Sequence, residues 1–156
     1  TVVFGASNFV VHRQTFWDAG GWSPGVFHLD MTDLLLKLGL SGTTLVILAP
    51  NTVWYRIHSA NVTHAVAMIL RCAKVLLKKE RAGEYPGGRK NLFARSTCLG
   101  GPMLSWILVA VGKGLYLEAV KLACSAWLTI LAAIVRRFIA VCRGRRPVQS
   151  VELLHD

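Results

Sequence analysis

The apolar segment 122–135 constrains the fold of this chain more than any other feature. It holds 14 residues without a charge and lies between Lys121 and Arg136. It belongs to a longer helical pattern, 115–142, in which apolar residues recur every three or four positions. A membrane-spanning helix needs roughly 17–25 apolar residues. We therefore expect this segment to pack against other helices or to lie on a membrane, rather than to cross one.

The net charge of the chain is distributed unevenly. Residues 1–65 hold three bases and three acids, whereas residues 66–156 hold 15 bases and five acids. The whole net charge of +10 therefore belongs to the second part. This asymmetry indicates an anionic partner, which can be a membrane surface, a phosphorylated substrate or nucleic acid. The bases are not interleaved with aromatic residues in a known binding motif, so we expect no nucleic-acid partner.

Residues 1–64 combine strand and helix signals. Short runs rich in β-branched and aromatic residues predict strands at 1–4, 9–11, 43–48 and 53–57. Between these runs, Thr15 can cap a short helix that ends at Gly20 and Gly21. A second short helix is predicted at 34–38. We expect residues 1–64 to form one unit.

Residues 65–147 are predicted to form a helical extension. The segment 65–81 has an apolar stripe and a basic opposite face, which is typical of an amphipathic helix. A short helix is predicted at 102–111, with Pro102 in its first turn, because Gly100, Gly101 and Pro102 interrupt the uncharged stretch that precedes it. The pattern 115–142 predicts the last helical segment, either continuous or broken near its middle, and residues 148–156 are predicted to be a loose tail.

The four cysteines are widely separated and show no metal-binding spacing. Isolated thiols of this kind are typical of a reducing compartment. We therefore expect a cytoplasmic protein, with a possible peripheral position at the inner face of the plasma membrane.

Three stretches of the first unit, taken in order, resemble one family. Residues 19–25 (AGGWSPG) resemble the glycine-rich turn of inverting family 2 glycosyltransferases. Residues 27–42 (FHLDMTDLLLKLGLSG) are similar to the acidic motif of that family and the apolar helix that follows it. Residues 55–63 (YRIHSANVT) resemble the segment that closes its catalytic domain.

The resemblance implies an α/β fold, the C-terminal half of a Rossmann-like GT-A domain, followed by the helical extension. It implies transfer of a sugar from a nucleotide-sugar donor to a carbohydrate or lipid-linked acceptor, with inversion. It also implies a divalent metal, Mg²⁺ or Mn²⁺, in the whole enzyme. The Asp-x-Asp motif of the family does not occur in this sequence, so we expect this chain to be the acceptor-side part, which alone would be inactive.

The resemblance places the catalytic acidic motif at Asp30 and Asp33. Aligned without a gap, Met31 occupies the position of the catalytic aspartate, and methionine cannot accept a proton. A shift of one residue would make Asp30 the base; otherwise the base is lost. Asp33 is also well placed to stabilise a helix N-terminus.

The resemblance assigns further roles to residues beside this motif. It assigns the metal, or the departing diphosphate, to His58. The residues expected to contact substrate are Gly20, Gly21, Trp22 and Arg56.

Simpler interpretations stay open at each position. Asp30 can cap a helix without catalysis, His58 can be a half-buried strand residue, and Trp22 can be a packing residue. The alternative function is a non-catalytic module whose basic helices bind an anionic membrane surface.

Overall fold

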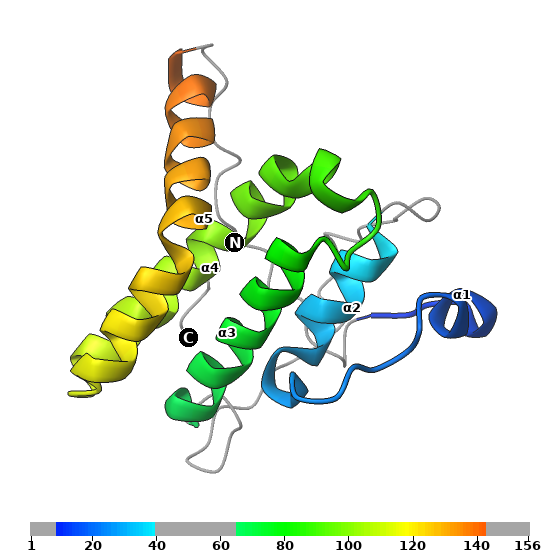
Figure 1. Ribbon diagram of the computed structural model, residues 1–156, viewed down its shortest axis with the longest axis horizontal. Helices are drawn as coiled ribbons and strands as arrows, with labels where there is room; N and C mark the ends of the chain where they lie inside the picture. The colour runs from blue at the N-terminus through cyan, green and yellow to red at the C-terminus, as the bar shows by residue number, and fades with distance from the viewer. Residues whose placement is uncertain (1–8, 40–64, 143–156) are drawn as a thin grey trace, which may run out of the picture.

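The computed structural model of this protein describes residues 9–39 and 65–142, and these residues are all-helical. Figure 1 shows α3, α4 and α5 packed together, with α2 beside α3 and α1 further out. The helices, in chain order, are α1 (Arg13–Asp18), the 3₁₀ helix η2 (Phe27–Leu29), α2 (Asp30–Leu38), α3 (Val66–Ala82), the 3₁₀ helix η4 (Gly88–Asn91), α4 (Leu92–Gly112) and α5 (Tyr116–Cys142).

The predicted α/β, GT-A-like fold is wrong, because the described ranges 9–39 and 65–142 contain helices and no strand. The strand predicted at 9–11 is irregular chain that leads into α1. Val10 is 96% exposed, so this short run has no apolar surface to pair against. The strands predicted at 1–4, 43–48 and 53–57 lie outside the described residues.

The helices of the first unit begin earlier than predicted. α1 begins at Arg13 instead of Thr15, and it is followed by a turn in which Gly20 and Gly21 both have positive φ. α2 begins at Asp30 rather than at residue 34, and both acids of the motif lie in its first turn. Carboxylates at this end of a helix interact favourably with its dipole.

The amphipathic helix predicted at 65–81 is confirmed as α3. It ends at Gly83, whose φ of 75° lies in the left-handed region that glycine adopts readily. The N–H groups of Gly83 and Glu84 donate to the carbonyls of Glu80 and Lys79, which closes the last turn of the helix.

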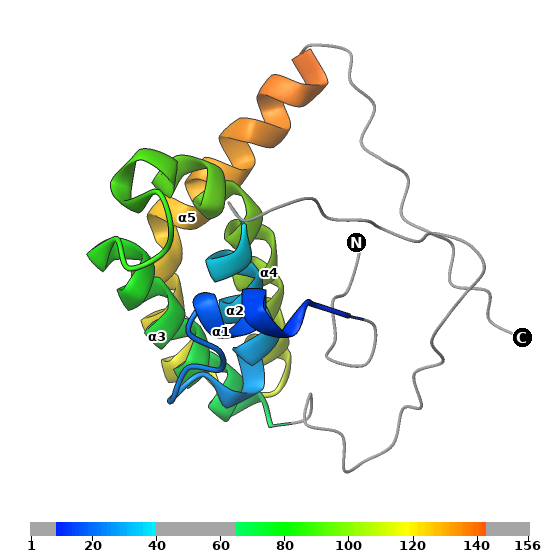
Figure 2. The same ribbon diagram turned by 90° about the vertical axis from the view of Figure 1, so that its right-hand side faces the viewer.

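The predicted break at Gly100, Gly101 and Pro102 is wrong, because α4 continues through all three residues. Gly100 is buried where α4 crosses α5, and a β-carbon there would overlap the Thr129 carbonyl and the Ala133 side chain. Close helix contact therefore outweighs the low helix propensity of glycine. The first part of α4 lies at an angle to the rest in Figures 1 and 2, as expected for a helix that contains proline.

α4 and α5 form an antiparallel pair, joined by a short turn at residues 113–115, and α3 packs against both. The helical segment predicted at 115–142 is confirmed as α5, which is continuous and has no break near its middle. In both figures the C-terminal end of α5 extends beyond the other described helices. The main core lies between these three helices and contains Val66, Leu70, Ala73, Leu77, Met103, Ala110, Ala119, Leu122 and Ala126.

Candidate functional site

Asp33 is fully buried and holds a cluster of polar side chains between α2 and α3. Its Oδ1 atom lies 2.6 Å from Lys79 Nζ and accepts a hydrogen bond of 2.7 Å from the Tyr85 hydroxyl. Its Oδ2 atom lies 3.0 Å from Lys37 Nζ. Lys37 follows Asp33 by one helical turn, so the two residues share a face of α2. The buried carboxylate is therefore surrounded by donors from three segments of the chain.

The same cluster reaches the glycine-rich turn after α1. Lys37 Nζ donates a hydrogen bond of 2.8 Å to the Gly21 carbonyl. Lys79 Nζ donates one of 2.9 Å to the Ser23 hydroxyl. We name Gly21, Ser23, Asp33, Lys37, Lys79 and Tyr85 the Asp33 cluster. It connects two of the sequence motifs, the glycine turn and the acidic motif.

The electrostatics of the cluster keep Asp33 ionised. Burial by itself raises the pKa of Asp33, but interactions with Lys79, Ser23, Tyr85 and Lys37 lower it to about 2. Burial and the Asp33 carboxylate beside it raise the pKa of Tyr85 well above its usual value. Asp33 therefore accepts hydrogen bonds as a carboxylate, and its low pKa makes it a poor general base at neutral pH.

Asp30 has a different environment, although it is only three residues away. It is partly exposed, and its Oδ1 atom accepts a hydrogen bond of 2.7 Å from the Met31 N–H. Met31, at the aligned position of the catalytic aspartate, is buried. Of the two predicted catalytic acids, Asp30 is the one that solvent reaches.

The other predicted site residues are only partly within the described ranges. Gly20 and Gly21 form the turn after α1, and Trp22 beside them is 51% exposed. The Trp22 ring packs edge-on against Phe16, with ring centroids 5.4 Å apart. Arg56 and His58 lie outside the described residues.

The implied Mg²⁺ or Mn²⁺ has no set of ligands in the part of the chain that the structure describes. Residues 9–39 and 65–142 contain no group of three histidines, cysteines or acids close enough to hold a metal ion. We therefore assign no chemical step in this chain to a metal.

A second buried ion pair fixes the loop after α3. Arg95 Nε lies 2.7 Å and 2.9 Å from the two carboxylate oxygens of Glu80. Its Nη1 and Nη2 groups donate hydrogen bonds of 2.7 Å and 2.6 Å to the Pro86 and Gly88 carbonyls. Arg95 thereby holds the loop that places Tyr85 beside Asp33.

The sequence reasoning missed Lys79, Glu80, Tyr85 and Arg95. A usable signal existed for two of them, because Glu80 continues the apolar stripe of α3 and Lys79 precedes it, away from the exposed Lys78 and Arg81. A charged residue on the buried side of a helix needs an internal partner. Nothing in the local pattern identified Asp33 as the partner of Lys79, or Arg95 as the partner of Glu80.

The outward side of α5 is apolar along nearly its whole length. Positions on this side are spaced alternately by three and four residues, and each large apolar side chain there is 49–69% exposed. We name these residues the outer face of α5: Leu117, Val120, Trp127, Leu131, Ile134, Phe138 and Val141. Both α4 and α5 are long and apolar enough to cross a membrane, by length and composition. This length and composition are consistent with membrane contact.

Bases on α3 lie beside the first half of α5. Lys74 Nζ lies 2.9 Å from the Glu118 carboxylate, and Arg81 donates a hydrogen bond to the Ser125 carbonyl. Both pairs are 44 residues apart in the sequence, so α3 and α5 run parallel here. Arg71 and Lys78 are exposed on the same helix. At 100° per residue, Glu118 and Ser125 lie on the side of α5 opposite its outer face, so the basic helix α3 approaches α5 from behind that face.

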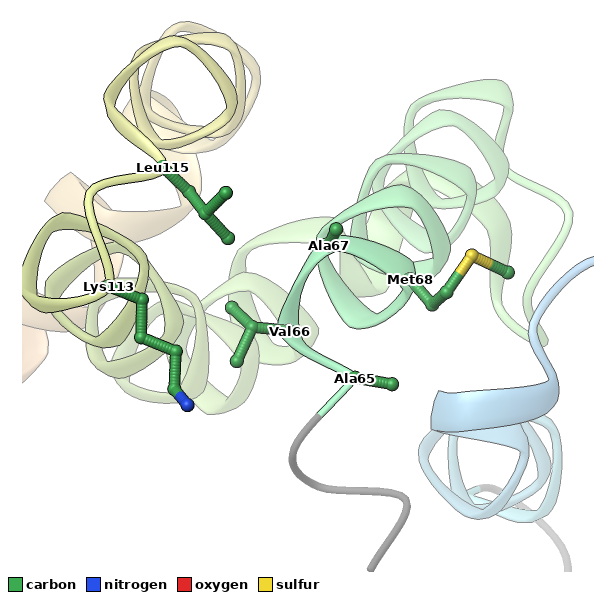
Figure 3. Close-up of a pocket in the computed structure, with 6 residues that line it drawn as sticks. All are labelled: Ala65, Val66, Ala67, Met68, Lys113 and Leu115. Atoms are coloured by element: carbon green, nitrogen blue, oxygen red, sulfur yellow. The ribbon is translucent and has the colours of Figure 1, made fainter. Parts of the chain in front are cut away.

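An open hollow of about 340 Å³ lies between the start of α3 and the α4–α5 turn. Figure 3 shows its lining: Ala65, Val66, Ala67 and Met68 come from the start of α3, whereas Lys113 and Leu115 come from the turn. Apart from the Lys113 ammonium, the lining side chains are apolar, so the hollow offers little catalytic chemistry.

The fold and these features define a helical protein with a buried ion-pair cluster and an exposed apolar helix face. No protein-family model matches the chain, and no curated protein or solved structure shows significant similarity to it.

Proposed function

We propose that this chain binds a membrane surface through the outer face of α5. The observation that carries the proposal is the continuous stripe of large, exposed apolar side chains on this helix. Monomeric soluble proteins rarely expose apolar patches of this extent. A helix with one large apolar face, in a protein that also carries many exposed bases, is typical of proteins that lie in the interface of an anionic membrane.

The position of α3 favours a helix that lies on the membrane over one that spans it. α3 runs beside the first half of α5 and carries exposed bases over residues 71–81, roughly 15 Å of helix. A spanning α5 would draw these bases toward the hydrocarbon, where charges are expensive. With α5 parallel to the surface and its outer face in the membrane, these bases stay on the water side of α5.

The proposed location is the cytoplasmic face of a membrane. All four cysteines are free, and three of them are exposed, which suits a reducing compartment. Anionic lipids of the cytoplasmic leaflet attract basic segments near the surface.

Co-sedimentation with lipid vesicles tests membrane binding. We expect the chain to bind vesicles that contain phosphatidylglycerol and to be released progressively by salt. The double substitution Leu131→Gln and Ile134→Gln should weaken binding roughly 30-fold or more, because burial of each side chain contributes on the order of 1–2 kcal/mol. Phe27→Gln is the control, since Phe27 is even more exposed than Leu131 and Ile134 but lies on η2. Equal binding of the double variant and the control would contradict the proposal.

A second function, transfer of a sugar to a hydroxyl acceptor, is favoured by the contrast between Asp30 and Asp33. A general base must reach solvent or substrate and must have a proton-accepting oxygen available. Asp33 is buried and ion-paired, whereas Asp30 is partly exposed on the first turn of α2. On this proposal Asp30 is the acceptor base, and Asp33 positions the helix that carries it. The ordered resemblance to family 2 glycosyltransferases supports the reaction class.

A sugar-transfer assay with a nucleotide-sugar donor tests this function. It uses the full-length protein that contains this sequence. Asp30→Asn should abolish transfer and leave the circular dichroism spectrum unchanged. Asp18→Asn is the control, because Asp18 is an exposed acid bonded only to Gln14 among the described residues. Activity that survives in Asp30→Asn would reduce Asp30 to a helix-start residue.

A further inference from the structure

The pair of helices that carries the outer face also contains a basic groove. It is a hollow of about 320 Å³ between the first half of α4 and the last part of α5. Thr97 and Gly101 line it from α4, and Ala133, Arg136 and Arg137 line it from α5. We name this hollow the Arg136 groove. None of the described residues that line it is acidic.

One guanidinium of the groove is already oriented. Arg136 Nη1 donates a hydrogen bond of 2.7 Å to the Thr97 hydroxyl, which holds the planar group at the α4 side. The same Nη1 group lies 3.9 Å from the Cys98 sulfur, and within residues 9–39 and 65–142 the other N–H groups of Arg136 and the guanidinium of Arg137 have no hydrogen-bond partner, so a ligand in the groove can bind them. One guanidinium group can donate two parallel, charge-assisted hydrogen bonds to two oxygens of the same phosphate.

Small residues keep the groove open. A β-carbon on Gly101 would meet no atom within 4 Å, so this glycine borders open space. Ala133 and Ala140 on the facing helix are also small. The resulting space can admit a group of the size of a phosphate between the two helices.

The groove lies beside the outer face of α5. The border lies at Arg137: Ile134 and Val141 are one helical turn before and after it on α5, and both are more than half exposed. A lipid could place its phosphate beside the arginines of the groove and lay an acyl chain along these apolar residues. We propose that the Arg136 groove binds a phosphate group, supplied by the headgroup of an anionic lipid. This inference rests on the proposed membrane binding and adds a defined headgroup site to it.

The test compares vesicles of phosphatidylcholine alone with vesicles that contain phosphatidylglycerol. The double substitution Arg136→Gln and Arg137→Gln should weaken binding to the anionic vesicles about tenfold more than the double substitution Arg89→Gln and Lys90→Gln. The control removes two exposed charges from η4, outside the groove. Both variants lose equal charge, so a general electrostatic effect would weaken them equally. Equal loss would overturn the groove as a site and leave membrane binding standing.

A second variant fills the groove without changing its charge. Gly101→Leu places a side chain in the open space and should reduce the preference for anionic over neutral vesicles several-fold. An unchanged preference would contradict the proposal. Failure of the unaltered chain to bind either vesicle would instead overturn the proposed membrane function itself.

Inorganic phosphate separates the two possible sources of the ligand. At millimolar concentration and constant ionic strength, it should displace the chain from anionic vesicles only weakly, because the lipid also offers an acyl chain. Full displacement that is lost in the Arg136→Gln and Arg137→Gln variant would assign the groove to free phosphate and overturn the lipid assignment.

Discussion

Lys79 Nζ lies 2.6 Å from Asp33 Oδ1, although the two residues are 46 positions apart in the sequence. This ion pair links α2, which carries the acidic motif, to α3, which begins the helical extension. Both partners are largely shielded from water, and the carboxylate has further donors in Tyr85 and Lys37. If the two helices moved apart, the buried charges would lose their partners, which is unfavourable. The ion pair therefore stabilises the contact between α2 and α3.

Replacement of Asp33 should destabilise the fold strongly. Asp33→Asn removes the negative charge and leaves the Lys79 ammonium without its counter-charge, which costs on the order of 3–5 kcal/mol for a buried pair. Urea unfolding followed by circular dichroism measures this loss. Asp18→Asn, on the exposed surface of α1, should change stability by less than about 0.5 kcal/mol. Equal stability of the two variants would mean that the Asp33 cluster contributes little.

The same cluster should make the protein sensitive to acid. The pKa of Asp33 is about 2 in the folded chain and 3.8 without the fold, so the unfolded chain binds this proton more readily. The stabilisation from ionised Asp33 is therefore complete above pH 4 and is lost as the pH falls toward 2. The loss amounts to roughly 2 kcal/mol, from the usual relation between pKa shift and free energy.

Unfolding measured between pH 2 and 6 tests this dependence. The stability difference between the unaltered chain and Asp33→Asn should shrink by about that amount as the pH falls. Tyr85→Phe removes one of the hydrogen bonds that lower the pKa of Asp33. Acid destabilisation of this variant should therefore begin at a higher pH. A stability difference that is independent of pH would contradict the ionised state of Asp33.

The sequence predicted the long helices well because their signals are local. The apolar periodicity of 65–81 and 115–142 corresponds closely to α3 and α5. The fold class failed because the strand signals were short, and the one at 9–11 has no partner within the described ranges. The prediction of a break at Gly100 was wrong because a distant contact overrides the local signal. Gly100 packs against α5, and this packing keeps it helical.

In the candidate site, too, the sequence revealed local features but not the contacts between distant residues. The motif pattern identified Asp30, Asp33, Gly20 and Gly21, and the Asp33 cluster includes two of these four. The partners Lys79 and Tyr85 lie far along the chain, where no local pattern relates them to an acid. The different environments of Asp30 and Asp33 follow from these distant partners, so sequence alone could not assign different tasks to the two acids on electrostatic grounds.

Arg95 should not tolerate replacement by lysine. Its guanidinium binds the Glu80 carboxylate and two loop carbonyls at once, and a single ammonium cannot reach all of them. We expect Arg95→Lys to lower the free energy of unfolding by about 2–3 kcal/mol, since charged hydrogen bonds contribute about 1.5–3 kcal/mol each. Hydrogen exchange of the loop around Tyr85 should also accelerate. Arg89→Lys, an exposed exchange in the same region, is the control and should change neither property.

Gly100 and Gly101 provide a matched pair that tests the packing of α4 on α5. They are adjacent in one helix, yet a β-carbon on Gly100 would lie 2.5 Å from the Ala133 β-carbon, whereas one on Gly101 would meet nothing within 4 Å. Gly100→Ala should therefore force the helices apart and destabilise the fold by about 3 kcal/mol, as overpacking does. Gly101→Ala should instead stabilise the helix by about 0.5–1 kcal/mol, because alanine has the higher helix propensity. Thermal unfolding of the two variants should give shifts of opposite sign. Shifts of the same sign would mean that α4 and α5 do not cross at Gly100.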